Sequence, residues 1–225
     1  LASASATFCW PVACGPVTTT VDVLRSGRRG AQVHGVLRDP GDDGGANVVV
    51  TAVFTDPALD GPTLTPLSRP VELLDAPPAD APPTRLEGEY PLGFLDNTEW
   101  QTATGTTGAD SSPAEAEVPR LALWFRFTDP PAAPGEDWDP ALLPIPGDAL
   151  GSALVVALGG GNQPVGSVSL QINIEVIAPL SGSWVGIDST CTNVSNGLAT
   201  GILHLWSEAG QHVATVTQTA MLRSM

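Results

Sequence analysis

The chain has 225 residues, 42% hydrophobic and 15% charged, which argues against wholesale disorder and suffices for one large domain or two domains of about 100 residues. Its formal net charge of −15 opposes binding to a phosphate backbone, so we expect no nucleic-acid partner. No apolar run approaches the roughly 20 residues of a membrane-spanning helix, and no basic leader opens the sequence, so we expect no membrane insertion and a cytoplasmic location.

The first part of the chain is rich in predicted strands. Alternating or apolar stretches at 16–24, 31–38 and 47–54 are separated by glycine-rich turns, as in antiparallel sheets. Proline then dominates 56–85, which favours an extended connection over a folded unit. We therefore divide the chain into a first unit at 1–56, a connection at 57–88 and a second unit at 89–225.

The second unit adds a strand and a helix before its own strands. An apolar strand is predicted at 120–127 and a helix at 139–158, where Asp139 and Pro140 suit the N-cap and first helical positions. Pro144 and Pro146 indicate that this helix is broken. Further strands are predicted at 169–177, 184–194, 198–206 and 213–222.

An internal repeat of about 165 to 168 residues relates the two units. Residues 6–12 align with 173–180, 30–37 with 197–204, and 44–50 with 209–215. Self-similarity at a fixed period indicates two copies of one architecture. The first copy begins too close to Leu1 to include the strand and helix that precede the second. Either the N-terminus of the protein lies upstream of Leu1, or the first copy is a degenerate half.

Cysteine and histidine give no sign of a metal site. Cys9, Cys14 and Cys191 have no metal-ligand spacing, and the three histidines lie on separate predicted strands. We expect reduced thiols, no metal and no cofactor. No GxSxG motif indicates a serine nucleophile.

Five motifs in order resemble the double-hotdog acyl-CoA thioesterases, which are thioesterase II-like proteins, and in particular their actinobacterial members. They are FLDNTEW at 94–100, LQINI at 170–174, WVGID at 184–188, GLATG at 197–201 and VATVTQ at 213–218. The resemblance implies an α+β fold, a tandem hotdog in which antiparallel sheets wrap a central helix, with the first repeat lacking its leading strand and helix.

The resemblance also implies a catalytic set of an Asp, a Thr or Ser and a Gln that together hold a water. By motif, Gln218 matches the glutamine, and Thr190 or Thr192 matches the hydroxyl. Gln171 stands at the position assigned to the Asp, and an amide cannot accept the proton of the attacking water. Asp188 is a candidate replacement base.

Two functions follow from these residues. The first is hydrolysis of a fatty acyl-CoA thioester to the free acid and CoA, by a protein that we expect to be a homodimer. The alternative is a catalytically impaired protein that binds an acyl-CoA or another acyl ligand but lacks the general base, as Gln171 suggests.

Overall fold

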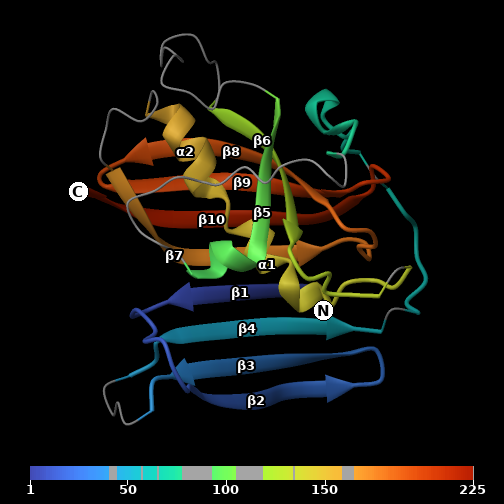
Figure 1. The fold of residues 1–225 in the computed structure, drawn as a ribbon. Helices are drawn as coiled ribbons and strands as arrows, with labels where there is room; N and C mark the ends of the chain where they lie inside the picture. The colour runs from blue at the N-terminus through green and yellow to red at the C-terminus, as the bar shows by residue number, and fades with distance from the viewer. Residues whose placement is uncertain are drawn as a thin grey trace.

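In a computed structural model of the protein, the structure describes residues 1–40, 45–56, 58–64, 66–77, 93–104, 119–133, 135–158 and 165–224. These residues form a ten-stranded antiparallel sheet with α1 and α2 packed on one face (Figure 1). The strands are β1 (Ser3–Phe8), β2 (Thr18–Gly27), β3 (Gly30–Arg38), β4 (Val48–Thr55), β5 (Thr98–Thr104), β6 (Arg120–Phe127), β7 (Val165–Val176), β8 (Val185–Ser195), β9 (Leu198–Ser207) and β10 (His212–Ser224). The helices are η1 (Val71–Leu73), η2 (Gly93–Asn97), η3 (Pro140–Leu142), α1 (Pro144–Gly147) and α2 (Leu150–Ala157).

The strand order confirms the repeat. It runs β2-β3-β4-β1-β7-β10-β9-β8-β6-β5, so the block β2-β3-β4-β1 is matched in reverse by β7-β10-β9-β8. The two copies meet where β1 pairs antiparallel with β7. This arrangement is a double hotdog, and residues 1–40 and 45–56 hold no counterpart of β5, β6 or α2.

The sheet has an apolar and a polar face. We call the face on which α2 packs the inner face, and the opposite one the outer face. On β7, Ile172 and Ile174 point into the core under the helices, while Gln171 and Asn173 alternate to the outer face. The alternation predicted for 169–177 is therefore confirmed for the part of the strand that follows Leu170.

The predicted helix at 139–158 is divided into η3, α1 and α2. Asp139 caps η3, because its carboxylate accepts a hydrogen bond from the Ala141 N–H at 2.9 Å, with Pro140 at the first position. The second break falls at Asp148 and Ala149, between α1 and α2. Sequence thus predicted the cap and the broken helix, and the break exposes a carboxylate ahead of α2.

By length and composition, Pro140–Ala157 qualifies as a possible membrane-spanning stretch. In the fold it is three short helices, and Leu143, Leu150 and Ala153 are each at most 1% exposed. The core of a globular domain accounts for its hydrophobicity.

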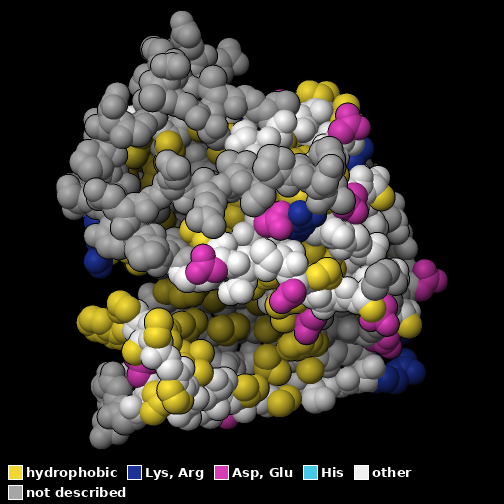
Figure 2. All heavy atoms as spheres, in the orientation of Figure 1, with side chains coloured by type: hydrophobic (Ala, Val, Ile, Leu, Met, Phe, Trp, Pro, Cys, Tyr) yellow, Lys and Arg dark blue, Asp and Glu magenta, His cyan; other side chains and the backbone are white. Residues whose placement is uncertain are grey.

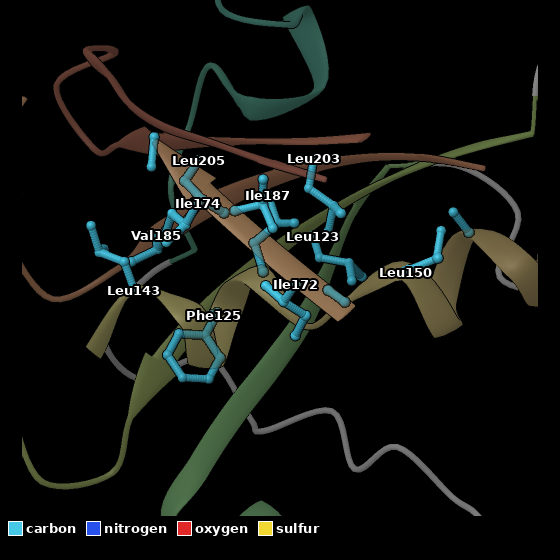
Figure 3. Close-up of a cluster of buried hydrophobic side chains, with 14 of the residues drawn as sticks. Leu123, Phe125, Leu143, Leu150, Ile172, Ile174, Val185, Ile187, Leu203 and Leu205 are labelled. Atoms are coloured by element: carbon cyan, nitrogen blue, oxygen red, sulfur yellow. The ribbon is translucent and has the colours of Figure 1, made fainter. Parts of the chain in front are cut away.

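The main core lies between α2 and the inner face of the second copy (Figure 3). Leu150 and Leu154 of α2 join Ile172, Ile187 and Leu203 of the sheet. Full burial of such a side chain contributes about 1.5–3 kcal/mol. This packing fixes α2, and with it the turn that precedes α2, against β6, β8 and β9.

The connection between the units also packs against the sheet. Leu73 of η1 is fully buried on the outer face with Trp124, Trp184 and Trp206. Arg69 anchors the segment by donating from Nη1 to the Glu208 carbonyl at 2.9 Å. Part of the proline-rich stretch therefore forms a small second core, which its composition did not indicate.

Gly201 permits the close approach of α2 to the sheet. A Cβ at this position would meet the Leu150 side chain and would lie 2.7 Å from the Thr190 carbonyl oxygen. The backbone oxygen cannot move aside as a flexible side chain does. We predict that Gly201→Ala lowers the free energy of unfolding by about 1–3 kcal/mol, measured by urea denaturation.

Gly61→Ala is the matched control, since no atom lies within 4 Å of a Cβ placed there. Equal stability of the two variants would contradict the close packing of Leu150 on Gly201.

Candidate active site

Three polar side chains meet at the N-terminal end of α2. Asp148 lies in the turn between α1 and α2, Ser169 on β7 and Gln218 on β10. Ser169 Oγ donates to Asp148 Oδ1 at 2.9 Å, and Gln218 Nε2 donates both to Ser169 Oγ at 2.8 Å and to Asp148 Oδ1. A carboxylate, a hydroxyl and an amide thus form one hydrogen-bonded set.

The backbone of α2 joins this set through Gln218. The Leu150 N–H donates to Gln218 Oε1 at 3.2 Å, so both ends of the amide are engaged. Ser189 Oγ, which is fully buried, donates to the Ala149 carbonyl at 3.3 Å. The turn that carries Asp148 is therefore held from β8 and β10 together, which orients the carboxylate.

A β-bulge in β7 brings Ser169 to the inner face. Gln171 pairs with Thr219, but the next pair is Ser169 with Ala220, so Leu170 is an extra residue without a partner on β10. Without the bulge, strict alternation would place Ser169 beside Gln171 on the outer face. This irregularity is the physical reason that the periodicity of the sequence did not single out Ser169.

The environment of Asp148 favours the neutral carboxyl. Although part of the residue remains exposed, burial of the carboxyl raises the pKa of Asp148 above its ordinary value, and hydrogen bonds from Ser169 and Gln218 oppose that rise in part. Its Oδ2 atom accepts no hydrogen bond from the described residues. A carboxylate of raised basicity with one oxygen unoccupied suits proton abstraction.

Of the five residues selected from the sequence, the structure places Gln218 in this set. Gln171 is on the outer face, where its amide donates to Ser5 Oγ at 3.4 Å. Asp188 forms a salt bridge with Arg120 on the outer face. Thr190 also lies on the outer face, where its register partner on β9 is Ile202. Thr192 Oγ1 lies 3.1 Å from the Thr200 carbonyl oxygen. The structure does not bring these four side chains to Gln218.

Asp148 and Ser169 were not selected from the sequence. The available signal for Asp148 was an acidic residue directly ahead of an apolar helix, after the helix-breaking Pro146 and Gly147. Ser169 carried no comparable signal, because its position depends on the bulge.

Two copies of one antiparallel strand order in a continuous sheet, with a helix packed on the inner face of the second copy, define a double-hotdog protein. Solved structures support this class. A conserved protein of unknown function with a hot dog fold from Alicyclobacillus acidocaldarius has a TM-score of 0.73 at 20% identity, over 100% of this chain and 79% of that one. A putative thioesterase II from Thermobifida fusca has a TM-score of 0.71 at 23% identity, over 99% of this chain and 78% of that one. The acyl-CoA thioesterase II TesB2 of Mycobacterium marinum has a TM-score of 0.72 at 19% identity, over 100% of this chain and 81% of that one.

Family models identify the chain more closely. The acyl-CoA thioesterase C-terminal domain matches residues 72–222, and the acyl-CoA thioesterase N-terminal domain matches residues 1–55. The chain belongs to this acyl-CoA thioesterase domain family. No curated protein matches it by sequence.

The raised pKa of Asp148 has a measurable consequence for stability. Its folded-state pKa exceeds the unfolded one, so the charged carboxylate is less favourable in the folded protein, and stability is lost as pH rises through the folded pKa. We predict that Asp148→Asn, which removes the charge, melts at a higher temperature than the wild type at pH 7.

The difference in melting temperature between Asp148→Asn and the wild type should vanish at a pH well below about 3.9, where the carboxyl is neutral in both folded and unfolded chains. Melting temperatures of both proteins across this pH range test the prediction. A lower melting temperature for the variant at pH 7 would show that the charged form is favoured instead.

Proposed function

We propose that this protein hydrolyses fatty acyl-CoA thioesters to the free acid and CoA, with Asp148 as the general base. The observation that carries the proposal is the set formed by Asp148, Ser169 and Gln218. Its residue types are those that the family resemblance implies: an Asp, a Thr or Ser, and a Gln. Family membership supports thioesterase chemistry.

In the proposed reaction, water bound at Asp148 attacks the thioester carbonyl carbon while Asp148 Oδ2 takes its proton. The tetrahedral intermediate then collapses, the C–S bond breaks, and the CoA sulfur leaves and takes up the proton from Asp148. Ser169 and Gln218 hold the carboxylate in place by donating to its other oxygen. General-base catalysis of this kind contributes typically about 10²–10⁴-fold.

The developing oxyanion needs hydrogen-bond donors, and the first turn of α2 supplies them. The first N–H groups of an α-helix have no partner within the helix. The Leu150 N–H is engaged by Gln218, so we assign the oxyanion contact to the N–H of Gly151, the next residue. Such a donor contributes about 3–4 kcal/mol to transition-state stabilisation in enzymes where one has been removed.

The alternative, an acyl-ligand-binding protein without a base, rested on Gln171 at the position expected for Asp. Asp148 weakens that reason, because it brings a carboxylate into contact with Gln218 from another element. The homodimer and the cytoplasmic location stay predictions.

Replacement of the proposed base provides the direct test. We predict that Asp148→Asn, which keeps the size and the hydrogen-bond acceptor, lowers kcat for a fatty acyl-CoA by at least about 100-fold. In the wild type, kcat/KM should fall at acid pH with an apparent pKa above the ordinary Asp value, because the raised pKa of Asp148 protonates the base. Release of CoA measured with a thiol reagent reports both quantities.

Gln171→Asn and Asp188→Asn are the matched controls, since both side chains lie on the outer face, and each should retain kcat within about twofold. Loss of activity in Asp188→Asn with full activity in Asp148→Asn would transfer the base to Asp188. Binding of acyl-CoA with no thiol release by the wild type would favour the binding protein.

A further inference from the structure

Two histidines and a threonine meet on the outer face of the hairpin formed by β9 and β10. His204 lies on β9 and pairs in register with Thr215 of β10, while His212 begins β10 opposite Trp206. The candidate active site lies on the inner face, so these side chains form a separate group. We call His204, His212 and Thr215 the histidine cluster.

A β-bulge brings His212 into this cluster. The register of β10 on β9 shifts between His212 and Ala214, so Val213 is an extra residue without a register partner on β9. Without the bulge, strict alternation would place His212 and Thr215, three positions apart, on opposite faces of the sheet. The irregularity therefore turns the imidazole of His212 outward, beside Thr215.

The three side chains present their polar atoms at equal spacing. His204 Nδ1 lies 3.3 Å from His212 Nε2, and Thr215 Oγ1 lies 3.3 Å from each of these nitrogens. Nitrogen and oxygen ligands of a tetrahedral zinc ion stand about 2.0–2.1 Å from the metal, which places neighbouring ligand atoms about 3.3–3.4 Å apart. The triangle of atoms therefore has the dimensions of one face of a metal coordination tetrahedron.

The imidazole rings are held in place and kept neutral. The ring of His212 packs between those of Trp206 and His204, with 4.9 Å and 5.2 Å between ring centroids. Burial lowers the pKa of both histidines, and neutral imidazole is the form that binds metals. His204 and Thr215 are only half-buried, so an ion can reach the cluster from solvent.

The charges around the cluster favour a cation. Glu175 of β7 pairs in register with Thr215, and Asp188 of β8 pairs with His204, so a carboxylate residue flanks the cluster on each side. Asp188 is bound to Arg120, whereas Glu175 has no ion pair among the residues that the structure describes. Acidic side chains are also scattered over the face displayed in Figure 2, with few basic ones, in line with the net charge of −15. The field of the whole protein therefore attracts cations.

We propose that His204 Nδ1, His212 Nε2 and Thr215 Oγ1 bind a divalent transition-metal ion of the zinc and copper class. Imidazole nitrogens are ligands for both metals, and water takes the remaining position. His212 Nε2 also lies 3.0 Å from the Ala214 carbonyl oxygen, which accepts its proton in the metal-free protein. The ion replaces that proton, and the ring stays neutral as the tautomer with its hydrogen on Nδ1.

Calorimetric titration with Zn²⁺ tests the site. The protein carries no affinity tag, and the Cys9→Ser and Cys14→Ser replacements remove the two exposed thiols, because thiolates also bind zinc. We expect saturable binding of one equivalent. His204→Ala and His212→Ala should each weaken the affinity by about tenfold or more, since each removes a nitrogen ligand.

Two further variants separate the cluster from its surroundings. Thr215→Val keeps both imidazoles and the shape of the side chain, so it should weaken binding less than loss of either histidine. His34→Ala is the matched control, because it removes a histidine from the outer face of β3. Its affinity for Zn²⁺ should equal that of the parent.

Cu²⁺ provides a measurement that does not depend on the folding of the variants. The electron paramagnetic resonance spectrum of the parent protein with one equivalent of Cu²⁺ should show coupling to two imidazole nitrogens, and that of each single histidine variant coupling to one. A parent protein without saturable Zn²⁺ binding, or with a copper spectrum that lacks two coupled nitrogens, would overturn the proposal. Loss of affinity in His34→Ala alone would also overturn it, since the metal would then bind on β3.

Discussion

The packing of α2 on the inner face of the sheet is the constraint on which the rest of this structure depends. Leu150 enters the space left by Gly201, and the same residue donates its N–H to Gln218. Hydrophobic burial and the polar site therefore share one helix turn. Any displacement of α2 breaks the core and moves Asp148 away from Ser169 and Gln218 at the same time, because these contacts lie within a few residues of each other.

The charged carboxylate of Asp148 lowers the stability of the folded protein, but it supplies the base of the proposed reaction. The carboxyl of Asp148 is held among protein atoms that favour its neutral form, and two donors from different strands compensate in part. Active sites commonly hold ionisable groups in surroundings that shift their pKa values and lower the stability of the folded protein. The buried hydroxyl of Ser189, which binds the Ala149 carbonyl, shows that the support of the turn extends beyond the reacting groups.

The two copies share a strand order but differ in what covers them. In the second copy, α2 turns the apolar inner face into a core, whereas the same face of β1 to β4 stays open in the part of the chain that the structure describes. The two copies join where β1 pairs with β7.

The sequence by itself determined most strands of both copies, although not β5. It also determined the repeat, the broken helix with its cap at Asp139, the family, and Gln218 as a site candidate, because periodicity, prolines and motifs are local properties of the chain. Only the tertiary structure decided which residues meet Gln218. The bulge at Leu170 turned Ser169 inward and left Gln171 outward, and the packing of α2 brought in Asp148 from 70 residues away in sequence. Side-chain contacts such as these depend on strand register and on residues distant in sequence, and a local sequence pattern predicts neither.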